Sequence, residues 1–227
     1  MTPFEVILVF VKHPEPGRVK TRLAAGVGNE RSAEVYRRLA ERTLRTVRAA
    51  ATAPGRRVRL AVDPPQRVAD VSRWLGPDFP AAPQAAGHLG ERMSAAFADA
   101  FEDGAQRVVI VGTDCPGLAP FDIDAAFTAL STNDVVVGPA EDGGYWLLGL
   151  AEHRPPLFED IAWSEPDVLT RTLLKLRRAA VRFILLRTLR DVDTVEDLRA
   201  LVPELESPAP PPPAARPDSP HATGDLP

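Results

Sequence analysis

One aspartate, Asp114, directly follows a short apolar segment near the middle of the chain. Residues 108–111 read Val-Val-Ile-Val, which is typical of a buried strand, and residues 112–116 read Gly-Thr-Asp-Cys-Pro. Ligands of open α/β sheets gather at the carboxyl ends of strands, where a carboxylate can hold a hard cation such as Mg²⁺ against phosphate oxygens. Alternatively, Asp114 only starts a Pro-Gly turn and bonds nearby backbone amides. The spacing alone favours neither role.

A second acidic pair, Asp191 and Asp193, follows another strand-like segment at 181–186. Residues two apart on an extended segment point to the same side, so both carboxylates can face one cation. Asp193 also fits the N-cap of a helix that runs to about Leu201, with Glu196 completing a capping box. Asp191 has no such local role and is therefore the better candidate ligand. Whether it meets Asp114 depends on the fold.

A basic loop follows the first apolar segment of the chain. Lys20 and Arg22 lie in this loop, 12–22, and both are cations suited to phosphate. The loop is not a Walker A motif, which needs Gly-Lys-Ser/Thr, because Lys20 follows Val19 and the loop has a single glycine, Gly17. On its own, the loop is better explained as a solvated basic segment.

A glycine pair stands beside two acids in Glu141-Asp142-Gly143-Gly144. Glycines at Gly143 and Gly144 would let backbone amides approach a ligand closely, and adjacent acids are unusual in a simple turn. We therefore interpret Asp142, Gly143 and Gly144 as part of a loop on the substrate side. The alternative is an ordinary tight turn.

Two predicted helix starts carry weaker signals. Gly90 and Arg92 open a helix and could face a phosphate or nucleotide, although an ordinary helix start with an exposed arginine gives the same pattern. Ser164 precedes a helix that starts at about Pro166. Its side chain would either cap this helix or contact a substrate. Cys115 lies beside Asp114, but a small buried cysteine explains it better than a nucleophile does.

The elements that must position these residues alternate along the chain. Strands separated by helices predict a largely parallel sheet covered on both faces, and the glycine pair between two strands predicts an antiparallel hairpin within it. Strands are expected near 6–11, 58–62, 108–111, 135–137, 145–150 and 181–186, and helices near 36–47, 67–75, 89–101, 123–130 and 166–178.

The chain changes character at Pro203. Nine of its 24 prolines fall within 203–227, and such a composition does not form a packed core. We predict one folded domain over 1–202 and a disordered, proline-rich tail over 203–227.

Composition narrows the class of protein. With 44% hydrophobic and 26% charged residues the chain resembles ordinary globular proteins, and a net charge of −4 provides no broad basic field for nucleic acid. No apolar run approaches the roughly 20 residues of a membrane span. A single cysteine fits a reducing compartment, so we expect a cytoplasmic protein.

Taken together, the motifs resemble a bacterial family described as rSAM/selenodomain-associated transferase 1, within the nucleotide-diphospho-sugar transferase (GT-A) superfamily. The resemblance runs in family order from about Phe4 to Leu201. Its matching segments are 16–23, Gly87 with 89–93, 112–117, 138–140, 142–145, 163–164 and 191–194.

The resemblance implies a three-layer α/β/α GT-A-like domain with a mixed, mostly parallel sheet. It also implies that Asp114 corresponds to the metal-binding aspartate of the superfamily and that Lys20 corresponds to the lysine that nucleotidyltransferases use on donor phosphates. The Asp191-x-Asp193 pair looks like the second acidic site of guanylyltransferases that act on phospholactate-type substrates.

These expectations combine into one hypothesis for the site. Lys20 and Asp114 are the catalytic candidates, and Mg²⁺ or Mn²⁺ would be held by Asp114, Asp191 and Asp193. The nucleotide or its phosphates would contact Gly17, Lys20, Arg22, Gly90, Arg92 and Thr113, and the acceptor would contact Asp142, Gly143, Gly144 and Ser164.

The leading functional interpretation is nucleotidyl transfer from a nucleoside triphosphate to a small phosphorylated or hydroxylated acceptor. Glycosyl transfer from a nucleotide sugar is the runner-up. A non-catalytic nucleotide-binding domain ranks third, because such a module has little use for three carboxylates.

Overall fold

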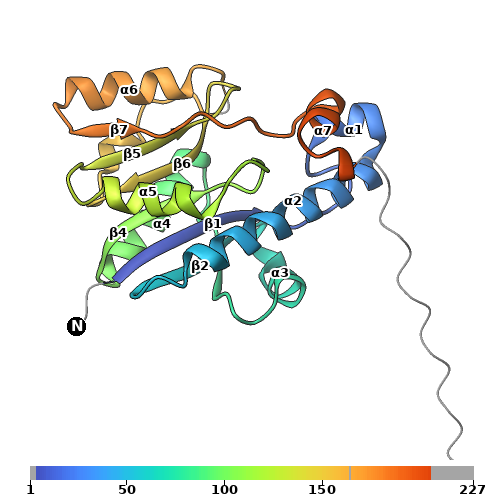
Figure 1. Ribbon diagram of the computed structural model, residues 1–227, viewed down its shortest axis with the longest axis horizontal. Coiled ribbons are helices and arrows are strands. Elements are labelled where there is room, and N and C mark those ends of the chain that lie inside the picture. Colours follow the sequence, from blue (N-terminus) through green and yellow to red (C-terminus); the bar gives the residue numbers. More distant parts are fainter. Residues whose placement is uncertain (1–3, 164, 206–227) are drawn as a thin grey trace, which may run out of the picture.

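The chain folds around one seven-stranded sheet (Figure 1). The computed structural model describes residues 4–163 and 165–205. Across the sheet the strands follow the order β3-β2-β1-β4-β6-β5-β7, and β6 alone runs antiparallel to its two neighbours. The expected mixed, mostly parallel sheet is thereby confirmed. The strands are β1 (Phe4–Lys12), β2 (Arg56–Asp63), β3 (Ala81–Pro83), β4 (Ala105–Val111), β5 (Val135–Pro139), β6 (Tyr145–Leu150) and β7 (Phe183–Leu185).

Helices cover both faces of this sheet, as a three-layer fold requires. Strand β1 shows why, because it is apolar on both sides: Ile7 and Val9 pack toward one layer, whereas Val6 and Leu8 pack toward the other. The first layer contains α2 (Asn29–Ala50), α3 (Val68–Leu75) and α5 (Pro120–Ala129), and the second contains α4 (Leu89–Glu102) and α6 (Val168–Arg178).

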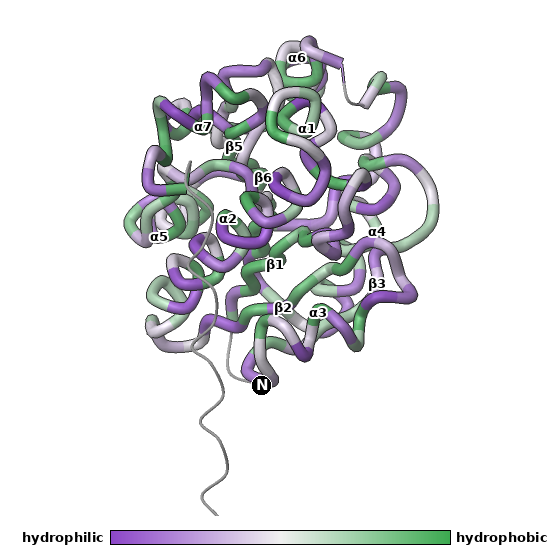
Figure 2. The backbone as a smooth tube through the Cα atoms, turned by 90° about the vertical axis from the view of Figure 1, so that its right-hand side faces the viewer, coloured by the Kyte–Doolittle hydropathy of each residue, from purple (hydrophilic) through white to green (hydrophobic). Residues whose placement is uncertain are grey.

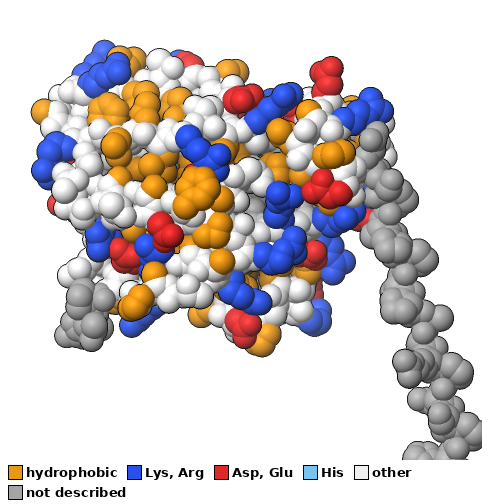
Figure 3. Space-filling view, viewed as in Figure 1, with side chains coloured by type: hydrophobic (Ala, Val, Ile, Leu, Met, Phe, Trp, Pro, Cys, Tyr) orange, Lys and Arg blue, Asp and Glu red, His pale blue; other side chains and the backbone are white. Residues whose placement is uncertain are grey.

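Helix α2 is amphipathic, with Tyr36, Leu39 and Leu44 among its buried residues. Its outer face carries arginines, and Figure 3 shows basic side chains gathered over this part of the molecule. Figure 2 shows the hydrophobic colouring of β1 inside the fold. None of the helices in the described part of the chain is both long and apolar enough to cross a membrane.

The predicted hairpin is present, since β5 and β6 pair antiparallel across the 140–144 turn. The prediction omitted β3, whose Ala-Ala-Pro sequence has no β-branched or aromatic residue. It also omitted α1 (Thr21–Val27), which begins directly after Lys20 in the segment interpreted as a loop.

A third apolar group joins helix α1 to the C-terminal helix α7 (Val195–Leu201) beside the N-terminal half of α2. The two helices lie side by side in Figure 1, and a Cβ on Gly26 would come within 2.3 Å of Val195. This close contact brings Lys20, before α1, near the segment that precedes α7. The described fold continues to Leu205, whose side chain is buried in this group, so residues 203–205, predicted as the start of the tail, belong to the fold; the rest of the predicted tail, 206–227, lies outside the described residues.

Candidate functional site

The two acidic segments meet at the carboxyl end of the sheet. Asp114 follows β4, and its carbonyl oxygen accepts a hydrogen bond of 3.0 Å from the backbone N–H of Val192. Three residues before Val192, Leu189 forms a bridge with Ala140 after β5, and the Leu189 carbonyl accepts a 3.0 Å hydrogen bond from the Glu141 N–H. The fold therefore places Asp191 and Asp193 next to both Asp114 and the 140–144 turn.

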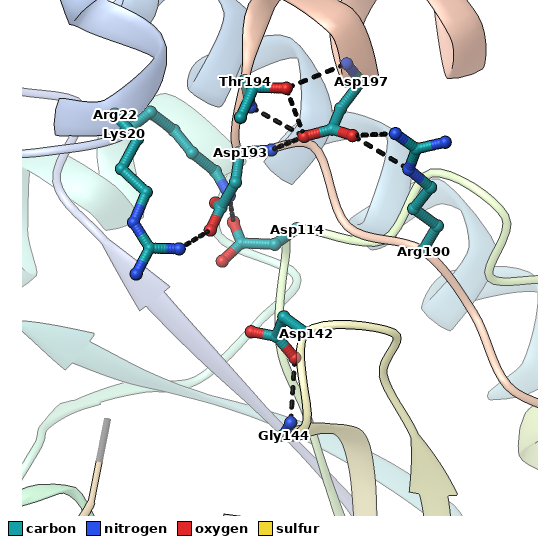
Figure 4. Close-up of polar contacts among 9 residues, drawn as sticks. All are labelled: Lys20, Arg22, Asp114, Asp142, Gly144, Arg190, Asp193, Thr194 and Asp197. Carbon is teal, nitrogen blue, oxygen red and sulfur yellow. Dashed lines mark hydrogen bonds and ion pairs between the residues drawn. The ribbon is translucent and has the colours of Figure 1, made fainter. Parts of the chain in front are cut away.

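Lys20 links the two acidic segments from the other side. Its ammonium nitrogen lies 3.1 Å from Oδ1 of Asp114 and 2.9 Å from Oδ1 of Asp193 (Figure 4), and the side chain is only 5% exposed. Burial alone would lower the pKa of Lys20, but the two carboxylates outweigh it and hold the pKa above its ordinary value. Lys20 is therefore a fixed positive charge in the wall of the site.

The backbone of Lys20 has a left-handed conformation, with φ of 48°. Residues other than glycine adopt it at a cost, and such positions gather at functional sites. Here the conformation ends the loop after β1 and starts α1 one residue later, which turns the Lys20 side chain back toward the carboxylates.

Arg22 is the second cation of this group. Its guanidinium lies 3.3 Å from Oδ2 of Asp193, so Asp193 contacts both cations through its two oxygens. The Arg22 side chain is 73% exposed and can reach a ligand. The predicted pairing of Lys20 and Arg22 at one site is thus present in the structure.

Asp142, Asp191 and Asp193 form a group of carboxylates whose nearest oxygens all lie within 4.8 Å of one another. Asp142 was expected on the acceptor side, and it is positioned by a hydrogen bond of 2.9 Å from the Gly144 N–H to its Oδ1 (Figure 4). Burial raises the pKa of Asp191 to about 6, and the neighbouring Asp193 and Asp142 add to the effect. An all-oxygen donor set of this kind suits a hard divalent cation.

Asp114 lines the same cavity as these three carboxylates. In Figure 4 it lies between Asp142 and the pair formed by Lys20 and Asp193. The structure thus places Asp114, Asp191 and Asp193 in one cavity, but the group of close carboxylates contains Asp142 in place of Asp114, whose Oδ1 lies 3.1 Å from the Lys20 ammonium.

The interpretation of Asp193 as a helix cap is wrong. The N-cap of α7 is Thr194, and the box is completed by Asp197 instead of Glu196. Asp197 accepts hydrogen bonds from the backbone N–H groups of Asp193 and Thr194 at 3.1 and 2.8 Å, and Arg190 donates to its other oxygen at 2.9 Å. The Asp193 side chain is consequently directed to Lys20 and Arg22 (Figure 4).

Two adjoining cavities open at this end of the sheet, with volumes of about 530 and 410 Å³. Because they share wall residues, they form two halves of one cleft. The larger half, here called the basic half, has four cations among its described lining residues, and the smaller, here called the acidic half, has five carboxylates. The shared residues are Arg22, Leu89, Gly112, Asp114 and Asp193.

A buried network supports the floor of the basic half. The Tyr36 hydroxyl accepts a hydrogen bond of 2.7 Å from the Lys12 N–H and lies 3.1 Å from the Thr113 hydroxyl. Burial raises the pKa of Tyr36, so this side chain stays neutral. Thr113 was predicted to contact the nucleotide; it lines the cavity while its hydroxyl bonds Tyr36.

Arg92 also lines the basic half, where its guanidinium lies 3.2 Å from Asp63 and donates to the Gly87 carbonyl at 2.8 Å. Gly90 has a packing role, because a Cβ there would lie 2.3 Å from the indole of Trp163. Gly17 lies in an exposed turn with φ of 79°.

The remaining acceptor-side predictions are Gly143, Gly144 and Ser164. Gly144 lines the acidic half, and Gly143 has φ of 90° with the Pro166 carbonyl oxygen where a Cβ would be, so both conformation and space require glycine there. Ser164 lies outside the described residues. Cys115 is buried, and burial raises the pKa of its thiol, which suits the small apolar role expected of it.

Several lining residues escaped the sequence analysis. Tyr36 fits the apolar stripe of α2, which conceals its polar hydroxyl, and Gln84 follows the unrecognised strand β3. Lys12 ends β1, where its position after a buried strand was the available signal. Glu165 lies on a connecting segment without regular patterning.

Comparisons with known proteins bear on the family. The family DUF2064, described as an uncharacterized protein conserved in bacteria, has a model that matches residues 46–165. A protein from Desulfovibrio desulfuricans G20, provisionally assigned as a nucleotide-diphospho-sugar transferase, is 38% identical. The match covers 88% of this chain and 87% of that one, with a TM-score of 0.80. No curated protein matches the sequence.

More distant structures share the fold. CMP:2-keto-3-deoxy-manno-octonic acid synthetase in complex with CTP is 16% identical, with a TM-score of 0.53 over 88% of this chain and 99% of that one. Rv0371c from Mycobacterium tuberculosis H37Rv, in complex with manganese, is 18% identical, with a TM-score of 0.50 over 89% and 99% of the two chains. At these identities the likeness establishes the fold, which is that of nucleotide-diphospho-sugar transferases.

Proposed function

Because the chain belongs to the DUF2064 family, whose fold here is GT-A-like, we propose that it is a metal-dependent transferase that uses a nucleotide. Its reaction is nucleotidyl transfer: a nucleoside monophosphate moves from a nucleoside triphosphate to a small acceptor. We also propose that the protein belongs to the narrower family rSAM/selenodomain-associated transferase 1 and that it is cytoplasmic.

One observation carries this proposal: the buried ammonium of Lys20, held between Asp114 and Asp193 where the two halves of the cleft join. A buried charge is costly unless it is paired, and a permanently protonated amine at such a point suits the phosphates of a bound nucleotide. Arg22 and Arg92 line the same half. Their positions support triphosphate binding in the basic half.

The carboxylates supply a matching place for Mg²⁺ or Mn²⁺. Asp142, Asp191 and Asp193 would hold the cation, with Asp114 beside them in the same cavity. Bound there, a divalent cation would neutralise charge on the phosphate oxygens and draw the carboxylates together. The manganese complex of the mycobacterial fold relative supports this choice of metal.

The residues of the chain would then act mainly by position and charge. Lys20 and Arg22 would orient the triphosphate and stabilise charge that develops near the α-phosphorus. The acceptor oxygen forms a bond to this phosphorus, the bond to the β-bridging oxygen breaks, and pyrophosphate leaves. When the acceptor is a hydroxyl, its proton passes to solvent. Because the acceptor oxygen itself attacks the phosphorus, the reaction requires no nucleophile from the protein.

Glycosyl transfer from a nucleotide sugar is the second candidate, because the 38% identical Desulfovibrio protein is provisionally assigned to that class. The same cleft would then hold a nucleoside diphosphate as the leaving group. The two reactions differ in the bond that breaks, and therefore in the released product.

Binding and product analysis would test the proposal together. Calorimetric titration with Mg²⁺ should show metal-dependent binding of a nucleoside triphosphate, weakened by Lys20→Met and unchanged by the matched variant Lys175→Met on α6. Release of pyrophosphate supports nucleotidyl transfer, and release of a nucleoside diphosphate from a nucleotide sugar supports the alternative. Metal-independent binding without turnover across both donor classes would instead identify a binding domain and refute the proposal.

A further inference from the structure

The acidic half of the cleft has an aromatic wall. Tyr145, Trp146 and Trp163 line this cavity of about 410 Å³, together with the carboxylates of the candidate metal group. Aromatic side chains next to a few well-placed polar groups are typical of small-molecule sites. The wall thus calls for a ligand with an apolar face.

Two glycines make room for the indoles. A Cβ on Gly90 would come within 2.3 Å of Trp163, and a Cβ on Gly138 within 2.4 Å of Trp146. Each indole nitrogen also donates to a backbone carbonyl, from Trp163 to Phe158 at 3.4 Å and from Trp146 to Arg187 at 3.2 Å. The aromatic wall is therefore held in place by packing and hydrogen bonds.

The charges of the cleft are divided between its halves. Among the described residues, the acidic half is lined by a single cation, Arg22, which already lies 3.3 Å from Asp193. Its carboxylates are Asp114, Asp142, Glu165, Asp191 and Asp193. Lys20 and Arg22 pair with Asp114 and Asp193, so one bound divalent cation together with these two side chains would still leave the five carboxylates with a net negative charge. The basic half, by contrast, is lined by Lys12, Lys20, Arg22 and Arg92.

We propose that the acidic half binds an uncharged, ring-shaped polyhydroxy acceptor, such as a pyranose or cyclitol that carries neither phosphate nor carboxylate. This inference rests on the proposed function. The sequence allowed either a phosphorylated or a hydroxylated acceptor, and the inference selects the hydroxylated one. The ring's C–H face packs on the aromatic wall, and its hydroxyl groups donate hydrogen bonds to carboxylate oxygens. A phosphorylated acceptor would face like charges instead.

Saturation-transfer NMR on the full chain tests the proposal directly. The probes are a panel of unphosphorylated pyranoses and cyclitols and the matching sugar and cyclitol phosphates, each recorded with Mg²⁺ and with and without a non-hydrolysable nucleoside triphosphate. We expect saturation transfer to members of the uncharged panel, with affinities at least 10-fold above those of their phosphates. Preference for the phosphates, or binding of neither panel, would overturn the proposal.

Two pairs of variants separate recognition from folding. Trp163→Leu should weaken binding of the uncharged ligand at least 10-fold, whereas Trp163→Phe keeps most of it; thermal unfolding verifies that both fold. Glu165→Lys, on an exposed segment of the wall, should improve binding of the phosphates at least 5-fold. The same change at exposed Glu159 is the control and should leave both panels unaffected.

The outcomes also distinguish this inference from the proposed function. Sugar binding that depends on Trp163, in a protein that binds no nucleotide with metal, would refute the transferase proposal and leave the acceptor class standing. Metal-dependent nucleotide binding combined with a preference for phosphates would support the transferase proposal and refute the uncharged acceptor class. An unchanged ligand preference in both Trp163→Leu and Glu165→Lys would contradict the assignment of the acidic half.

Discussion

The ammonium nitrogen of Lys20 lies 2.9 Å from Oδ1 of Asp193, although 173 residues separate them in the sequence. Asp114 lies 3.1 Å from the same nitrogen, so one lysine joins the loop after β1, the end of β4 and the segment before α7. Lys20 thereby offsets carboxylates that would otherwise repel one another in a partly buried site. Any cation that binds these carboxylates must share or replace this contact.

Replacing Lys20 with methionine should therefore have opposite effects on two ligands. Affinity for the nucleoside triphosphate should fall about 10-fold or more, since a hydrogen bond to a charged group contributes about 1.5–3 kcal/mol. Affinity for Mn²⁺ alone should rise, because the carboxylates lose a competing cation. Calorimetric titration of each ligand measures both effects, with Lys175→Met as the control. A loss of affinity for both ligands would show that Lys20 does not compete with the metal ion for the carboxylates.

Asp114→Asn should reduce metal-dependent turnover at least 100-fold, because the amide lacks the charge that orients Lys20 and supports the metal group. The side chain keeps its size, so thermal unfolding should change little. Initial rates at saturating Mg²⁺ give the measurement. Asp99→Asn, at an exposed position on α4, supplies the control. Equal rates in the two variants would remove Asp114 from the site.

Asp191 should make the metal-free protein less stable as pH rises. Its folded-state pKa of about 6 exceeds the ordinary value of 3.8, so the folded state holds the proton more tightly. This contribution is complete below pH 3.8 and is lost as pH rises through 6. After allowance for partial solvent exposure it amounts to about 1 kcal/mol, or a shift of roughly 2–4 °C in Tm.

Asp191→Asn isolates that effect, because it removes the titrating group and keeps its shape. In chelator-treated protein, the Tm difference between variant and wild type should grow in favour of the variant between pH 4 and pH 7. Differential scanning calorimetry at several pH values follows it. A difference that is constant across this range would show that Asp191 titrates normally.

Tyr36→Phe should destabilise the fold by about 1–3 kcal/mol, since it leaves the Lys12 N–H and the Thr113 hydroxyl without their buried partner. Urea unfolding measures the change. In the double variant with Thr113→Val, the second substitution should cost less than it does alone, because the two hydroxyls interact. Strict additivity would argue against the network.

The outline of the fold could be predicted because it depends on local patterns. Buried runs such as 108–111 and the apolar stripe of α2 set the strands and helices. Helix α1 was missed because Lys20 and Arg22 look like loop residues, and the left-handed backbone at Lys20 leaves no trace in residue type. The cap of α7 was misplaced by one residue because Asp193 and Thr194 are both good caps.

The composition of the site depended on contacts between distant segments. Asp142 was interpreted as part of a substrate-side loop; it lies in a turn and accepts a hydrogen bond from Gly144, and its place beside Asp191 and Asp193 follows only from the pairing of Leu189 with Ala140. The division of the cleft into a basic and an acidic half is likewise a property of the assembled walls. Spacing within the sequence carries no such information.

Transfer of label from a nucleoside triphosphate distinguishes nucleotidyl transfer from glycosyl transfer. The protein would be incubated with Mg²⁺, the panel of uncharged and phosphorylated acceptors, and a triphosphate labelled with ³²P at either the α or the γ position. We expect that α-label enters an acceptor product while γ-label appears in pyrophosphate, and that Lys20→Met reduces both. Product formed only from nucleotide sugars, with release of a nucleoside diphosphate, would contradict nucleotidyl transfer.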